Sequence, residues 1–229
     1  MSLPIAPHPV QIPCKAILFD MDGILISSIG SVERSWTIWA NSHGIDPEYA
    51  CRMAHGCRSI DTIALLRPDL DAQAENDIIE GMEIADTEGI ILLPGVLDLL
   101  TALSPDRWTV VTSATDHLAR VRLAAGGVPV PEHLITAESV TEGKPHPAPY
   151  LAGAALLGFA PEDCVVFEDA ASGTKSGHAA GCTVVATTFS HPIEALGAAD
   201  YLVEDVTGIK VKTLANGEGL VLTLTPLAG

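Results

Sequence analysis

Short apolar segments alternate with amphipathic segments along most of the chain. Residues 119–125 and 148–157 have the apolar spacing of helices, and Gly158 is typical of a helix end. Other apolar runs are short enough for buried strands, and most of them are rich in β-branched residues. These runs are 17–20, 109–112, 165–168 and 183–186. Strands separated by helices predict an α/β fold, a parallel sheet with helices on both faces.

Residues 30–90 interrupt this alternation, because they contain no convincing strand. The helical patterns in this block are 31–43, 59–66 and 72–88. We therefore expect a helical insertion between the first strand and the turn at Leu93, Pro94 and Gly95. The predicted division is a core of residues 14–29 and 93–229, a helical insertion of residues 30–92, and a poorly ordered lead-in of residues 1–13.

A hairpin is predicted near the end of the chain. Residues 211–213 and 220–224 have strand character and flank Asn216 and Gly217. Asn-Gly between two apolar runs is the strongest short-range signal for a tight turn between antiparallel strands.

Composition excludes several classes of protein. A chain of 229 residues with 48% apolar content can bury a full core. Its formal net charge of −17 disfavours nucleic acid and anionic membranes as partners. No apolar run approaches the roughly 20 residues of a membrane span, and residues 1–13 lack the basic residues of a targeting segment. The five cysteines are scattered, which argues against zinc and disulfides and favours a cytoplasmic protein.

Two carboxylates and a glycine follow the first predicted strand. Asp20 and Asp22 lie on the same side of an extended chain. The carboxyl ends of strands are where open α/β sheets bind ligands. Two carboxylates converging there can hold a hard cation and leave an oxygen free to attack an electrophile. The alternative is an Asp-Gly turn without a chemical role.

Three later segments carry further polar groups at predicted strand ends or in a restricted loop. Thr112 and Ser113 precede a helix, so they form either an anion cradle or an ordinary helix cap. Lys144, between a glycine and a proline, is either a cation for a phosphate or carboxylate, or a solvated lysine. Glu168 and Asp169 either cap a helix or complete, with the first aspartate, the oxygen-rich shell that Mg²⁺ prefers.

In this order, these segments resemble the four motifs of the haloacid dehalogenase-like hydrolase superfamily, over about residues 16–205. The resemblance implies a modified Rossmann fold with an inserted helical cap, which residues 30–92 fit. Residues 55–63, 143–151 and 166–173 are similar to segments of the glycerol-phosphate and 2-deoxyglucose-6-phosphate phosphatases.

The resemblance implies Mg²⁺-dependent hydrolysis of a small phosphomonoester, such as a sugar or polyol phosphate. Asp20 would attack phosphorus to form an aspartyl phosphate, and Asp22 would protonate the leaving alkoxide and then activate water. The implied metal ligands are Asp20, the backbone carbonyl of Asp22, Asp169 and, near or in the shell, Glu168. The implied substrate contacts are Thr112, Ser113, Ala114 and Lys144 in the core, and His55 and Arg58 in the cap.

Other activities within the superfamily are less consistent with these residues. β-Phosphoglucomutase uses a histidine in its first cap helix, where this chain has Val32. A dehalogenase would lack the second aspartate, and a non-catalytic metal-binding relative would be expected to lose Asp20 or Lys144. One departure from the family is Ile24, where many relatives have threonine. By analogy with capped relatives, we expect a monomer.

Overall fold

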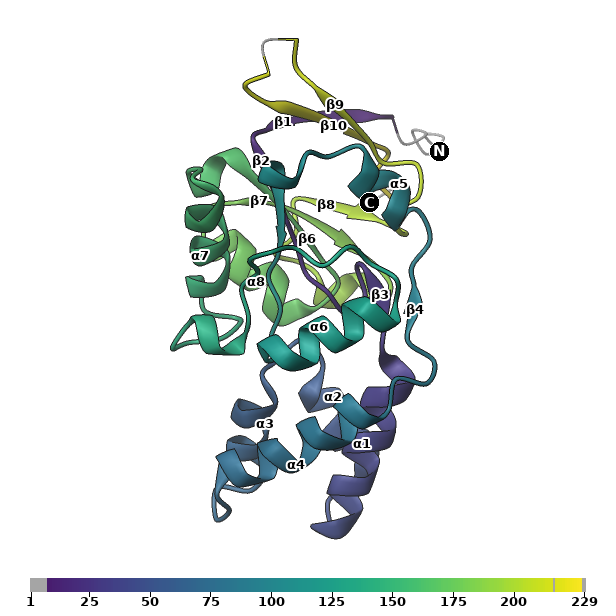
Figure 1. Cartoon of the computed structure of the whole chain (residues 1–229), viewed down its shortest axis with the longest axis vertical. Coiled ribbons are helices and arrows are strands. Elements are labelled where there is room, and N and C mark those ends of the chain that lie inside the picture. The colour runs from purple at the N-terminus through teal and green to yellow at the C-terminus, as the bar shows by residue number, and fades with distance from the viewer. Residues whose placement is uncertain (1–7, 216, 228–229) are drawn as a thin grey trace, which may run out of the picture.

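A five-stranded sheet forms the centre of the molecule (Figure 1). The computed structural model describes residues 8–215 and 217–227. The strand order is β5-β2-β6-β7-β8, and every neighbouring pair is parallel. The strands are Trp108–Val110 (β5), Ala16–Phe19 (β2), Cys164–Glu168 (β6), Thr183–Thr187 (β7) and Tyr201–Val203 (β8). The predicted parallel α/β fold is confirmed.

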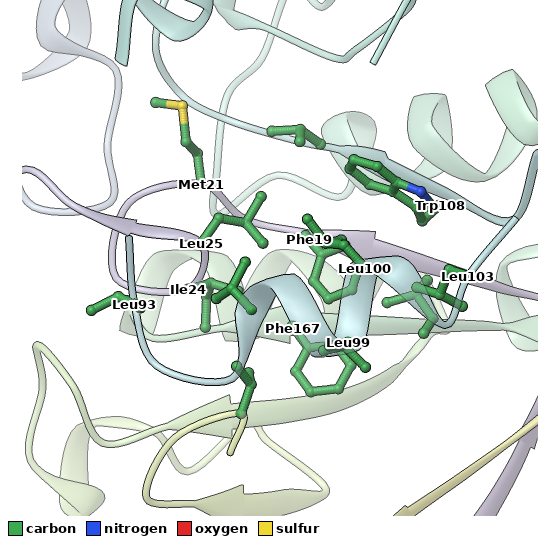
Figure 2. Close-up of a cluster of buried hydrophobic side chains, with 14 of the residues drawn as sticks. Phe19, Met21, Ile24, Leu25, Leu93, Leu99, Leu100, Leu103, Trp108 and Phe167 are labelled. Atoms are coloured by element: carbon green, nitrogen blue, oxygen red, sulfur yellow. The ribbon is translucent and has the colours of Figure 1, made fainter. Parts of the chain in front are cut away.

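Helices cover both faces of this sheet, because alternate strand residues face opposite sides. On one side, the rings of Phe19 and Phe167 stack with centroids 5.3 Å apart, beside Leu99 of α5 (Figure 2). On the other side, Leu18 packs in one buried cluster with Tyr150 of α7. The helices of this part are Val96–Thr101 (α5), Asp116–Ala125 (α6), Ala148–Leu157 (α7) and Ala171–Ala179 (α8). Short 3₁₀ helices lie at Pro105–Arg107, Ala137–Ser139, Pro161–Asp163 and Ile193–Ala195.

The helical insertion has a hydrophobic core of its own, built around Trp36, Trp39 and Ile63. Its helices, called the cap helices below, are Ile29–Ser42 (α1), Pro47–Ala54 (α2), Ser59–Leu66 (α3) and Ala72–Ala85 (α4). They lie together at one end of the molecule, and the paired strands Ile26–Ser27 (β3) and Ile91–Leu92 (β4) connect them to the sheet (Figure 1). The helix α2 was not predicted; the residues that it buries, Ala50, Cys51 and Ala54, lie on one face but are small, so their apolar signal is weak.

A second, antiparallel sheet joins the two ends of the chain. Its order is β1-β10-β9, with strands Val10–Cys14 (β1), Leu220–Leu224 (β10) and Lys210–Thr213 (β9). The predicted hairpin of β9 and β10 is confirmed, while Asn216 of its turn lies outside the described residues.

The expectation of a poorly ordered lead-in is wrong for residues 10–13. They belong to β1, which pairs with β10 and buries Ile12 and Cys14. Pro13 is compatible with this strand because β1 lies at the edge of its sheet, where a missing N–H leaves no ladder bond unmade. Residues 1–7, the rest of the predicted lead-in, lie outside the described residues.

Among the described helices, none has the length and apolar character that crossing a membrane requires.

Candidate active site

The parallel sheet brings the predicted acidic residues to one edge. Asp20 follows β2, and its backbone N–H donates to the carbonyl of Phe167 in the neighbouring strand β6, at 2.9 Å. Glu168 ends β6, and Asp169 follows directly. Carboxylate oxygens of Asp20, Glu168 and Asp169 lie within 4.8 Å of one another. Residues almost 150 positions apart therefore form one buried cluster, because parallel neighbours present their carboxyl ends at the same edge.

Lys144 extends from its loop into this cluster. Its Nζ donates to Asp20 Oδ1 and Glu168 Oε1, both at 2.7 Å, and to the carbonyl of Val111 at 3.0 Å. Burial lowers the pKa of Lys144, but the two adjacent carboxylates outweigh burial and raise this pKa above its ordinary value. The side chain is therefore a charged ammonium group fixed beside Asp20.

The carboxylate of Glu168 is occupied by four donors. Oε1 accepts from Lys144 and from the Tyr150 hydroxyl at 2.8 Å. Oε2 accepts from the backbone N–H groups of Asp169 and Ala170 at 2.9 and 3.0 Å. These bonds orient Lys144 and the turn that carries Asp169. Among the carboxylates predicted to bind the metal, Glu168 is thus the one most engaged within the protein.

The donor set fits a hard divalent cation such as Mg²⁺. Burial raises the pKa of Asp20 to about 7, against the attraction of Lys144. Burial and the charges of Glu168 and Asp20 also raise the pKa of Asp169 well above its ordinary value. Three carboxyl groups thus face one ammonium group in a buried space. A divalent cation held by carboxylate oxygens would balance this excess of negative charge.

Gly23 leaves the room that Asp169 occupies. A Cβ atom at Gly23 would lie 1.7 Å from Asp169 Oδ2, and the φ of 83° is itself unfavourable for other residues. Asp169 Oδ2 also accepts from the Ser190 hydroxyl at 2.5 Å. The Asp-Gly pair after β2 is therefore required by the packing of a second motif as well as by the turn.

Asp22 lies apart from the acidic cluster and faces the cap. Its Oδ1 accepts from the Ser28 hydroxyl, and its Oδ2 accepts from Arg122 Nη1 at 3.1 Å. The other terminal nitrogen of Arg122 lies 3.2 Å from a carboxylate oxygen of Glu83 in α4. The sequence analysis missed Ser28, Arg122 and Glu83. One signal existed, since Arg122 lies three positions after Ala119, on the buried face of its helix.

A cavity of about 90 Å³ separates this edge of the sheet from the cap helices. This volume is well below the 300–1,000 Å³ of typical small-molecule sites, so it suits a small substrate. Predicted residues that line it are Asp20, Asp22, His55, Thr112, Ser113, Ala114 and Asp169. Lys144 and Glu168 lie behind Asp20 and do not line the cavity.

The hydroxyl residues before α6 contact different partners. The Thr112 hydroxyl accepts from the backbone N–H of Ala114 at 3.1 Å. The Ser113 hydroxyl donates to the carbonyl of Gly56 in the cap at 3.4 Å, and the Ser172 hydroxyl donates to the same carbonyl at 2.8 Å. The loop that carries Gly56 is therefore held directly over the motif residues of the core.

The two predicted cap residues differ in their placement. His55 directly follows α2, lines the cavity and places Nδ1 2.7 Å from the carbonyl of Cys51. Arg58 pairs with Asp61 at 2.7 Å and donates to the carbonyl of Thr141 at 3.0 Å. The structure does not bring Arg58 to this cavity, contrary to its predicted place beside the substrate. Instead, the side chain connects the cap to a core loop.

We expect Glu83 to make the free energy of unfolding of the protein dependent on pH. Burial raises the pKa of Glu83 from 4.5 to about 7, although Arg122 opposes this shift. Protonated Glu83 therefore stabilises the folded state below pH 4.5, and this contribution is lost as the pH rises through 7. Between these values, Glu83→Gln should remove about 3 kcal/mol of pH dependence from the free energy of unfolding. Urea unfolding at several pH values, with chelator present, measures the free energy of unfolding of both proteins. Parallel curves of this free energy against pH would contradict the prediction.

Comparisons with known proteins find similar sequences over most of the chain. A family model described as haloacid dehalogenase-like hydrolase matches residues 14–181. The chain is 40% identical over 213 residues to hexitol phosphatase A of Escherichia coli, an alignment that covers 91% of this chain and 99% of that protein. It is 35% identical over 224 residues to glycerol-1-phosphate phosphohydrolase 1 of Saccharomyces cerevisiae, covering 91% and 89%.

A solved structure shows the same fold. The β-phosphoglucomutase of Clostridium difficile superposes with a TM-score of 0.75 and 19% identity, covering 86% of this chain and 93% of that one. At this identity, the likeness concerns the fold alone.

Proposed function

The chain belongs to the haloacid dehalogenase-like hydrolases and is a phosphoric monoester hydrolase, and on this premise we propose that it hydrolyses a small sugar or polyol phosphate through an aspartyl phosphate, with Mg²⁺ as cofactor. The names of two relatives, a hexitol phosphatase and a glycerol-1-phosphate phosphohydrolase, support this substrate class. The observation that carries the proposal is the position of Asp20, which lines the small cavity and is held by Lys144.

Asp20 is the proposed nucleophile. One carboxylate oxygen would form a bond to phosphorus while the bond between phosphorus and the leaving alkoxide breaks. Lys144 binds Oδ1, which fixes the orientation of the carboxylate and places a positive charge near the phosphoryl oxygens. In the second step, water attacks phosphorus and Asp20 is released as a carboxylate.

Asp22 is the proposed general acid and base. It would donate a proton to the leaving alkoxide and later accept a proton from the attacking water, so the proton balance closes over one turnover. Ser28 and Arg122 hold its two oxygens at the cavity, on the side of the cap. This position suits contact with a leaving group that extends toward the cap helices.

The proposed metal ligands are the carboxylates of Asp20 and Asp169 and the backbone carbonyl of Asp22. Glu168 would act chiefly by holding Lys144 and the turn before Asp169, because four donors already occupy its oxygens. When bound, Mg²⁺ would neutralise negative charge on the nucleophile and the phosphate.

Phosphate contacts are proposed for the residues before α6. Thr112, Ser113 and Ala114 line the cavity just before the N-terminus of this helix, where anions are favoured. The Thr112 hydroxyl accepts from Ala114, which leaves the hydroxyl hydrogen to donate to a phosphate oxygen. We also propose a monomer, since one chain supplies every site residue named here.

Phosphate release tests the proposal. We expect the protein to hydrolyse a hexitol phosphate, glycerol 1-phosphate or 2-deoxyglucose 6-phosphate in the presence of Mg²⁺. Chelation should lower the rate of hydrolysis at least 100-fold and excess Mg²⁺ should restore it, because a metal supplies several kcal/mol of charge stabilisation. Isomerisation of β-glucose 1-phosphate is assayed in parallel. Isomerisation without phosphate release would identify a mutase instead, and no turnover of any of these compounds would contradict the proposal.

A further inference from the structure

A buried charged pair links the core to the cap beside the proposed general acid. Arg122 lies on core helix α6 and Glu83 on cap helix α4, with side chains only 5% and 3% exposed. Arg122 contacts Glu83 at 3.2 Å and Asp22 at 3.1 Å. Charged side chains are rarely buried to this extent without a partner for each polar atom.

One donor of this pair lacks such a partner. Among the described residues, Arg122 Nε is buried and has no hydrogen-bond acceptor. A buried donor without an acceptor is unfavourable by a free energy similar to that of a lost hydrogen bond. Both Arg122 and Glu83 line the cavity that also contains Asp20. The unmatched donor therefore belongs to a residue that borders the space where the substrate would lie.

Part of the wall around this charged pair is apolar. On this side the cavity is lined by Val32 and Trp36 of α1 and by Leu118 of α6. Val32 and Leu118 can contact carbon atoms but cannot hydrogen-bond hydroxyl groups, and Trp36 can do so only as a donor, through its indole N–H. A polyol entering this region would lose water from its hydroxyls, and the pair of Glu83 and Arg122 provides both an acceptor and a donor in exchange.

We propose that Glu83 and Arg122 bind hydroxyl groups of the leaving alcohol, and so make the enzyme selective for polyol phosphates over phosphates of simple alcohols. This inference rests on the proposed function and specifies the substrate. Burial raises the pKa of Glu83 to about 7, so near neutral pH its carboxyl group can accept or donate toward a hydroxyl.

Selectivity of this kind is measurable on the unmodified enzyme. A site built to bind a hydroxyl discriminates strongly against an analogue without it, because its own polar groups are then left unpaired. We expect kcat/KM for glycerol 1-phosphate to exceed that for n-propyl phosphate by about 100-fold or more. The two compounds share the phosphate and the three-carbon chain, so the ratio isolates the hydroxyl groups.

Variants of Glu83 assign this selectivity to the pair. We expect Glu83→Leu to reduce the ratio at least tenfold and Glu83→Gln, which can still hydrogen-bond, to reduce it less. A general loss of structure or of Asp22 positioning would lower both activities together and leave the ratio unchanged. Glu80→Gln is the matched control, because Glu80 lies on the same helix and accepts from Thr115 but does not line the cavity; its ratio should equal that of the wild type.

The outcomes separate this inference from the proposed function. Equal hydrolysis of both phosphates by the wild type would overturn the inference and leave the phosphatase activity intact. An unchanged ratio in a folded Glu83→Leu variant would overturn the role of Glu83. No hydrolysis of either compound, nor of the hexitol and sugar phosphates, would overturn both proposals.

Discussion

Asp20→Asn is expected to lower kcat by at least about 10⁴-fold, because loss of a covalent nucleophile removes most of the rate enhancement in enzymes of this kind. The neutral amide is a poor nucleophile, whereas the side chain keeps its size and its place beside Lys144. The expected change is therefore in turnover and not in packing. Phosphate release gives the rate, and mass spectrometry of quenched reactions shows whether a phosphoryl group is attached to the protein.

Asp163→Asn provides a matched control for this substitution. Asp163 also pairs with a lysine, Lys15, at 2.8 Å, but this pair is partly exposed at the surface. Such pairs contribute at most about 1 kcal/mol to stability, so turnover should be unaffected. Turnover by Asp20→Asn at more than a hundredth of the wild-type rate would rule out the covalent mechanism.

Gly173→Ala is expected to lower kcat at least 100-fold although glycine has no functional group. A Cβ atom at Gly173 would lie 1.6 Å from Glu168 Oε1 and 1.9 Å from its carboxyl carbon. The Glu168 carboxylate would have to move, and it would then release Lys144 and Tyr150. Because buried charges would lose their partners, we also expect a loss of about 3 kcal/mol in the free energy of unfolding.

Gly81→Ala is the control for this prediction. Gly81 lies within α4, and a Cβ atom there would meet no described atom within 4 Å. Replacing a helical glycine with alanine stabilises a protein by about 0.5–1 kcal/mol where there is room. Kinetics and urea unfolding of both variants measure the contrast. Wild-type kinetics in Gly173→Ala would show that the position of Glu168 does not control the activity.

The sheet and the acidic cluster were predictable because their signals are local. Each motif consists of a short apolar strand and the polar residues that follow it, as in 165–169. Once parallel strands are expected, the carboxyl ends must meet at one edge. The convergence of Asp20, Glu168 and Asp169 thus follows from pattern and topology together. The strand β1 was missed because its pairing partner, β10, lies at the other end of the chain.

The contacts of the cap illustrate what local patterns omit. The segment around His55 and Arg58 resembles phosphatase caps, but the resemblance does not specify which side chain faces the cavity. In the structure, His55 lines it and Arg58 binds a core loop. The difference arises because the contacts between cap and core join residues that are distant in the sequence, such as Arg58 and Thr141, so the residues near each side chain do not specify its direction.

By itself, the sequence determined the alternation of strands and helices in the core, the helical insertion and the acidic, hydroxyl and lysine residues at the sheet edge. These features depend on periodicity and on residues within a few positions of one another. Only the tertiary structure decided that Arg122 reaches Asp22, 100 positions away, and that Glu83 approaches it from the cap. Whether a charged side chain on a helix is solvated or buried depends on what packs against it, and that partner is distant in the sequence.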